Sequence, residues 1–158
     1  MTVLAATALA GVRLRVAGAD TPVVRAAVAR AGACGAHPVE DGAPAAQVLV
    51  GARTPGAAGV GDGTAAAYLV EAFTALRDVL AELPDGGGAV LLVETAQADD
   101  PTAGAVRALC RSLALEHAPR GVRVNVVLVP PGGDAGDLVP MLLGPAAAMM
   151  TGAVLEVA

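Results

Sequence analysis

The sequence of 158 residues contains no lysine, so all ten of its basic residues are arginine. Tryptophan is also absent, and tyrosine and phenylalanine occur once each. Reactions that depend on a lysine ammonium group are therefore excluded within this chain. Because hydrophobic residues make up 55% of the sequence, the core has to be built from alanine, valine and leucine. Small aliphatic side chains of this kind favour close packing of helices on a sheet.

Other features are missing as well. Two cysteines, Cys34 and Cys110, do not make a disulfide framework, and there is no CxxC or His/Cys cluster of the kind that binds a metal. The net charge of −5 and the lack of a basic run argue against nucleic-acid binding. No apolar run reaches the ~18 residues of a membrane span, and the N-terminal stretch lacks the positive start of a signal peptide. We expect a cytoplasmic protein with no metal site that binds neither nucleic acid nor membrane.

Short apolar runs bounded by turn residues predict the strands. Several of them are continuously apolar, which is typical of strands buried on both faces in a parallel sheet. The predicted strands cover residues 12–18, 34–39, 47–51, 89–93, 122–129 and 153–157.

Helical spacing of apolar residues predicts helices between these strands. Asp62 or Thr64 is the expected cap of the second helix, and Asp100 that of the third. Strands that alternate with helices through short loops predict βαβ units and a parallel sheet with helices on both faces. We therefore expect residues 1–158 to form a single α/β domain. The predicted helices cover residues 22–33, 64–83, 101–117, 138–143 and 145–150.

Three segments resemble the short-chain dehydrogenase/reductase family. GGAVLLVET, residues 87–95, resembles the strand that leads to the catalytic serine of that family. CRSLALEHAPRGVRVNVVLVPPG, residues 110–132, resembles the helix, strand and Pro-Gly loop beside the nicotinamide, and residues 141–158 resemble the C-terminal segment. The resemblance implies a Rossmann-like fold. It also implies a truncated one, because there is no room between Val39 and Gln47 for the helix and strand of the family.

The catalytic tyrosine and lysine of the family are missing from this chain. Counting back without a gap places Asp99 at the tyrosine position and Ala103 at the lysine position; the serine falls on or near Thr95, and the helix asparagine on or near Tyr68. The reaction needs a phenol whose pKa is lowered by an ammonium group. Asp99 is an anion at neutral pH and would repel the developing alkoxide, and Ala103 carries no charge. The resemblance thus implies a pseudoenzyme, in which Thr95, Asp99 and Tyr68 are the candidate catalytic groups for any remaining chemistry.

The cofactor-binding turn is also altered. In the family the first turn between strand and helix carries three glycines, which let the pyrophosphate approach the backbone. Gly18 matches the first glycine, whereas Pro22 and Val24 occupy the other two positions. Gly18, Pro131 and Gly132 match positions that contact the cofactor; retained turn residues are the alternative interpretation. We therefore expect no cofactor, and NAD(P) if any binds.

The two long helices predicted at residues 64–83 and 101–117 are retained. In the family, the equivalent helices form a four-helix interface between subunits, which implies a homo- or hetero-oligomer here. One face of each helix has to cover the sheet, so the sequence does not assign the outward face. The leading hypothesis is a catalytically defective subunit, structural or regulatory, that pairs with itself or with an active relative. The alternatives are a repurposed enzyme with non-redox chemistry on a small molecule, and an NAD(P)-dependent oxidoreductase completed by a partner.

Overall fold

The computed structural model describes residues 4–40, 42–54, 63–96 and 101–157. These residues form one sheet of six strands in the order β2-β1-β3-β4-β5-β6, and every neighbouring pair is parallel. The predicted parallel α/β sheet is confirmed. The strands are β1 (Arg13–Gly18), β2 (His37–Val39), β3 (Gln47–Arg53), β4 (Gly88–Glu94), β5 (Arg123–Val129) and β6 (Val154–Glu156).

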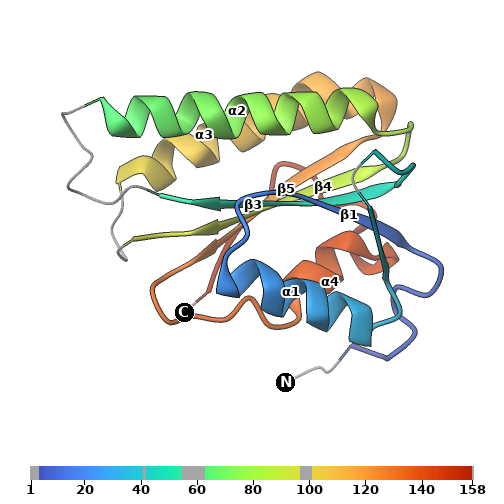
Figure 1. Cartoon of the computed structure of the whole chain (residues 1–158). Coiled ribbons are helices and arrows are strands. Elements are labelled where there is room, and N and C mark those ends of the chain that lie inside the picture. Colours follow the sequence, from blue (N-terminus) through green and yellow to red (C-terminus); the bar gives the residue numbers. More distant parts are fainter. Residues whose placement is uncertain (1–3, 41, 55–62, 97–100, 158) are drawn as a thin grey trace.

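Helices cover both faces of the sheet, as Figure 1 shows: α2 and α3 lie on one face, and α1 and α4 lie on the other. This is the doubly wound, Rossmann-like arrangement, and the predicted fold class is confirmed. No helix within the described residues is long and apolar enough to cross a bilayer. The helices are α1 (Pro22–Ala33), α2 (Thr64–Glu82), α3 (Pro101–His117) and α4 (Leu138–Leu143), with short 3₁₀ turns at Ala118–Arg120 and Pro145–Ala147.

The central strands are apolar on both faces because each face carries its own core. On β3, Val48 and Val50 belong to the cluster beneath α2 and α3, whereas Leu49 belongs to the cluster beneath α1 and α4. On β4, Leu91 and Leu92 divide between the two clusters in the same way. Each such side chain is almost completely buried and contributes about 1.5–3 kcal/mol to stability. Continuous apolar runs, rather than alternating ones, are the consequence.

The two helix caps that the structure describes at the starts of α1 and α2 differ from the predicted caps. In α1, Thr21 caps the helix because its Oγ1 accepts from the Val24 N–H at 3.2 Å. In α2 the cap position is Gly63, with φ 87° and no side-chain hydrogen bond, and Thr64 is the first helical residue. The prediction of Thr64 as cap is wrong, because the chain enters the helix through a left-handed conformation that glycine adopts without strain. The other two predicted caps, Asp62 and Asp100, lie outside the described residues.

The C-terminal part of the fold is held by one buried amide. Asn125 on β5 is 1% exposed; its side chain donates to the Met150 carbonyl at 3.0 Å and accepts from the Ala153 N–H at 3.1 Å. These bonds tie the chain before β6 to β5. The helix predicted at residues 145–150 is accordingly only a 3₁₀ turn, Pro145–Ala147.

An ion pair joins α1 to the start of α4 on the face that these two helices cover. The Arg30 Nε on α1 lies 2.5 Å from Oδ1 of Asp137, which immediately precedes α4. The hydrogen bond from Arg30, assisted by the Leu4 N–H, lowers the pKa of the Asp137 carboxyl. The pair therefore couples the packing of α1 against α4 to pH.

The connection from β2 to β3 is the shortest crossover of the sheet. It covers residues 40–46, of which the described ones form turns and coil without a helix or strand. The absence of room for a further helix and strand, predicted from the sequence, is confirmed for these residues. Strand β2 is also shorter than the predicted 34–39, because Cys34 still caps α1 with its backbone N–H.

Candidate functional site

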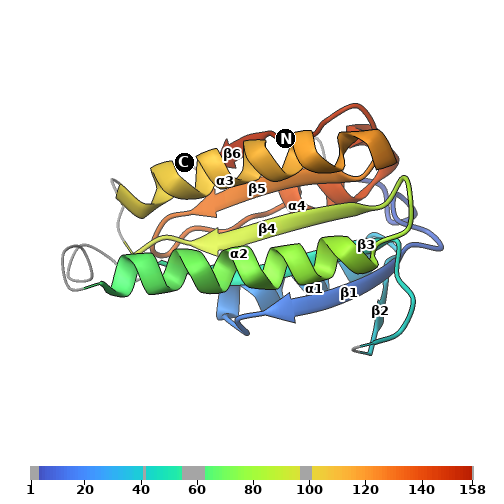
Figure 2. The ribbon, with the colours of Figure 1, turned by 90° about the horizontal axis from the view of Figure 1, so that it is seen from above.

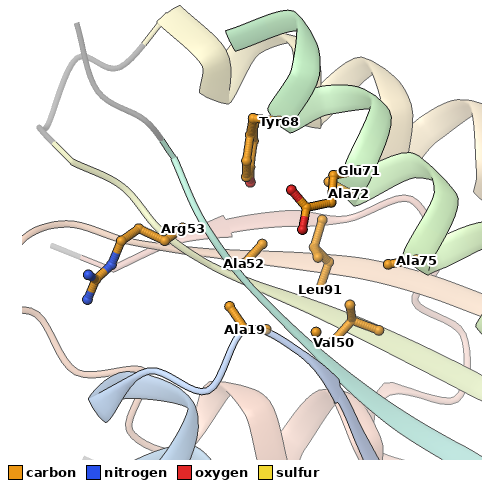
Figure 3. Close-up of a pocket in the computed structure, with 11 residues that line it drawn as sticks. Ala19, Val50, Ala52, Arg53, Tyr68, Glu71, Ala72, Ala75 and Leu91 are labelled. Atoms are coloured by element: carbon orange, nitrogen blue, oxygen red, sulfur yellow. The ribbon is translucent and has the colours of Figure 1, made fainter. Parts of the chain in front are cut away.

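A pocket of about 430 Å³ lies where the strand order reverses, between β1 and β3. It is lined by the carboxyl ends of these strands, by Leu91 on β4 and by one flank of α2 (Figure 3). Tyr68 and Glu71 point from α2 toward it. In open α/β sheets, ligands bind outside the carboxyl ends of the strands at this reversal. The pocket is therefore the first candidate site.

The turn after β1 is closed against β3 by two glycines. Gly18 has φ 79°, and the next residue, Ala19, donates its N–H to the Gly51 carbonyl at 2.8 Å. A Cβ on Gly18 would lie 2.3 Å from the Gly51 oxygen, and a Cβ on Gly51 would lie 2.2 Å from the Ala19 oxygen. The structure thus places the predicted Gly18 in the pocket and gives it a packing role that needs no ligand.

The N-terminus of α1 faces this turn, and a helix N-terminus binds phosphate through its free N–H groups. Pro22 has no N–H, the Val24 N–H donates to Thr21 Oγ1, and the Arg25 N–H donates to the Thr21 carbonyl. Asp20 adds a carboxylate beside the turn, which pairs with Arg25 at 2.8 Å. Of the donors at this helix start, the N–H of Pro22 is therefore absent, and those of Val24 and Arg25 are used within the turn.

Pro131 and Gly132 lie in the exposed loop after β5. Gly132 has φ 75°, and the Gly133 N–H closes the turn onto the Pro130 carbonyl at 2.9 Å. Neither Pro131 nor Gly132 lines the pocket beside Gly18, so the structure does not bring the three predicted cofactor positions into that pocket. Their geometry is that of turn residues.

A second pocket, of about 260 Å³, lies at the carboxyl ends of β4, β5 and β6. Thr95 lines it but is buried, and both its N–H and its Oγ1 donate to the Val129 carbonyl, at 2.8 and 3.2 Å. Ala103 also lines it and belongs to the core beneath α3. Arg107 on α3 forms an ion pair across it with Glu156 on β6. The polar groups of this pocket are therefore the Thr95 hydroxyl, which is bonded to the Val129 carbonyl, and the ion pair of Arg107 with Glu156.

The two predicted catalytic candidates that the structure describes line different pockets. Tyr68 lines the pocket at β1 and β3, and Thr95 lines the pocket at β4 to β6. Asp99 lies outside the described residues. The sequence does not predict Glu156 as a residue of this pocket. The one indication is that Arg107 has no acidic residue one turn away on its own helix, so its partner has to come from another element.

The cysteines are structural. Cys34 and Cys110 are both buried and free, as expected. Burial raises the pKa of the Cys110 thiol to about 11, so the thiol is neutral at physiological pH. Among the described residues there is no group of His, Cys, Asp and Glu side chains that could hold a metal.

Comparison with known proteins identifies a family and several solved structures that share this fold. A family model described as "Short chain dehydrogenase-like protein" matches residues 57–157. No curated protein sequence matches this chain. Solved structures that resemble it include BdcA from E. coli, with TM-score 0.72, 18% identity, and coverage of 94% of this chain and 99% of that one.

Two further solved structures show the same fold. A short-chain dehydrogenase/reductase from Serratia marcescens has TM-score 0.68 and 18% identity, covering 94% of this chain and 96% of its own. BdcA in complex with NADPH has TM-score 0.66 and 16% identity, covering 94% and 93%.

Proposed function

The chain belongs to the short-chain dehydrogenase-like family, and we propose that it is a subunit of that family without reductase chemistry. It pairs with itself or with an active relative and acts as a structural or regulatory partner. The observation that carries this proposal is the outward face of α2 and α3. That face exposes Val70, Phe73 and Leu115, whose exposed fractions are 65%, 38% and 77%. Exposed apolar side chains on two neighbouring helices support a surface for protein association.

The two helices lie side by side on one face of the sheet (Figures 1 and 2). Their inward positions, such as Leu76 on α2 and Val106 on α3, are completely buried in the core. Gly104 and Ala108 on α3 are exposed, and small residues of this kind allow the helices of another subunit to approach closely. A four-helix interface of the type implied by the family resemblance fits this surface.

The catalytic groups support a role without reduction. Ala103, at the lysine position of the family, is a core residue that is 7% exposed. The guanidinium of Arg107 is the basic group one turn further on, but it is paired with Glu156. Loss of general-acid catalysis costs on the order of 10²–10⁴ in rate.

The proposed subunit binds no dinucleotide. NAD(P) is the cofactor to test, because BdcA, one of the structures with this fold, was solved with NADPH. The turn after β1 supports the proposal, because Pro22 lacks a donor and the N–H groups of Val24 and Arg25 are both bonded to Thr21.

The assembly is tested by light scattering with two glutamates placed on the outward face. We expect Val70→Glu with Leu115→Glu to convert an oligomer to a monomer, because burying two unpaired carboxylates in an apolar interface is strongly unfavourable. Met149→Glu is the matched control, since Met149 is 97% exposed and lies outside both helices. A wild-type chain that stays monomeric, both alone and with an active relative, would contradict the proposal.

The pocket at the ends of β4 to β6 favours one alternative, a repurposed enzyme with non-redox chemistry on a small molecule. Thr95, Arg107 and Glu156 are its polar groups. Thr95→Val removes the hydroxyl at nearly constant volume, so an activity that survives this change would not use it. An oxidoreductase completed by a partner differs from both, because its activity appears only in the mixture of the two chains.

A further inference from the structure

The pocket between β1 and β3 has an apolar floor and an apolar wall. Val50 on β3 and Leu91 on β4 form the floor, and each of them is 1% exposed. Ala72 and Ala75 line the wall on α2 (Figure 3), and because their side chains end at Cβ, the helix leaves a volume of about 430 Å³ open. Small-molecule sites have this size and this mainly apolar lining, with a few polar groups that orient the ligand.

Two side chains of α2 supply the polar end of this pocket. Tyr68 and Glu71 point toward it (Figure 3), and since they are one helical turn apart they lie on the same flank of the helix. Tyr68 contributes an aromatic ring, whose face attracts cations. Glu71 contributes a carboxylate. An aromatic ring and a carboxylate on one flank are the two groups that together bind an organic ammonium ion.

The carboxylate of Glu71 is available to a ligand. Its oxygens form no ion pair or hydrogen bond with the described residues. The other charged residue of the lining, Arg53, is already engaged, because its Nη2 lies 2.8 Å from Glu94 Oε1. In Figure 3 the guanidinium of Arg53 also points away from Glu71. The pocket therefore presents one uncompensated negative charge, which attracts a cation and repels an anion.

The rest of the lining determines what kind of cation fits. Metal ions such as Ca²⁺ need several oxygen ligands, and within the described residues no cluster of acidic, His or Cys side chains accompanies Glu71. The floor of Val50 and Leu91 offers contacts to hydrocarbon instead. A ligand that matches both parts carries a single positive charge on an apolar body.

We propose that this pocket binds a small organic ammonium ion. Its charged head lies between the Tyr68 ring and the Glu71 carboxylate, and its hydrocarbon body lies on Val50 and Leu91. The inference goes beyond the proposed assembly, which uses the outward face of α2 and α3. It is measured on the purified chain alone, so it stands or fails independently of that assembly.

The chain carries its own reporter for this site. It has one tyrosine, Tyr68, and no tryptophan, so its tyrosine fluorescence comes from the pocket alone. Hexylammonium should change this fluorescence saturably, with a dissociation constant on the order of 1 mM or tighter. Hexanol keeps the hydrocarbon and lacks the charge, so it should bind about tenfold more weakly. Hexanoate should not bind, because Glu71 repels its carboxylate.

Variants assign the binding to the named groups by isothermal titration calorimetry with hexylammonium. Glu71→Gln should weaken binding about three- to fivefold, because the pair is partly exposed to solvent. Tyr68→Leu should weaken it about threefold, and Tyr68→Phe, which retains the ring, should lose less. Ala75→Leu fills the pocket and should abolish binding. Glu116→Gln is the matched control, since Glu116 is exposed on α3 outside the pocket lining and the same charge is removed.

Each other outcome would overturn the proposal. Equal affinity for hexylammonium and hexanol would show an apolar pocket without recognition of charge. Unchanged binding in Glu71→Gln, or an equal loss in Glu116→Gln, would place the ammonium group elsewhere, and absence of saturable binding would leave the pocket without this ligand. The comparison does not depend on a folding defect in Ala75→Leu, because Glu71 is exposed and its replacement by glutamine removes no contact within the described residues.

Discussion

Alanine in place of Gly51 should destabilise the protein, because the site has no room for a methyl group. The new Cβ would lie 2.2 Å from the Ala19 oxygen and 2.7 Å from Val24 Cγ2, both well inside van der Waals contact. The turn after β1 would have to move away from β3, which also weakens the hydrogen bond from the Ala19 N–H to the Gly51 carbonyl. Overpacking costs about 1–3 kcal/mol and the hydrogen bond about 1 kcal/mol more. The expected loss is therefore about 2–4 kcal/mol.

Thermal and urea unfolding measure this loss. At this chain length, 1 kcal/mol corresponds to about 2–4 °C, so Tm should fall by about 4–16 °C. Gly32→Ala is the matched control, since Gly32 lies in α1, a methyl group added there would meet no atom within 4 Å, and the change should gain about 0.5–1 kcal/mol. If Gly51→Ala melted at the wild-type temperature or above it, the closed packing of β1 on β3 would be refuted.

Three further outcomes are expected. Asn125→Leu leaves two partly buried backbone groups without the amide that bonds them and should lower the free energy of unfolding by about 2–4 kcal/mol in urea titrations; an unchanged midpoint would contradict the role of the amide. Because Arg30 lowers the pKa of Asp137 in the folded state, the stabilisation is present above the unfolded pKa of about 3.9 and is lost as pH falls through the folded pKa. Asp137→Asn should therefore reduce stability near pH 7 and differ less from wild type in acid, and a constant difference would refute this. Cys34 and Cys110 should resist maleimide at pH 8 and react only on unfolding; fast labelling of the native protein would show that burial is incomplete.

Much of the fold could be predicted because its central strands are buried on both sides. The apolar runs that became β3, β4 and β5 indicate a parallel sheet without any tertiary information. The ends of the elements could not be predicted to the residue. The sequence places Cys34 in a strand, but in the structure its N–H donates to carbonyls in the last turn of α1. Whether Cys34 ends the helix or begins the strand depends on where α1 ends.

The candidate site could be predicted only where single residues carry the signal. Gly18 is identifiable because it matches the first glycine of the family's turn, but its partner Gly51 depends on the register of β1 against β3. The separation of Tyr68 from Thr95, and the pairing of Arg107 with Glu156, are properties of the assembled sheet. No spacing in the sequence encodes contacts between such distant residues.

The most direct test of the account is NADPH titration and turnover with the purified chain, using simple ketone and acyl-thioester substrates. We expect no saturable change in NADPH fluorescence and no NADPH oxidation above the rate without protein. NADPH turnover that disappears in Asp99→Ala would contradict it, because the chain would then carry its own reductase chemistry at the position where the family has tyrosine.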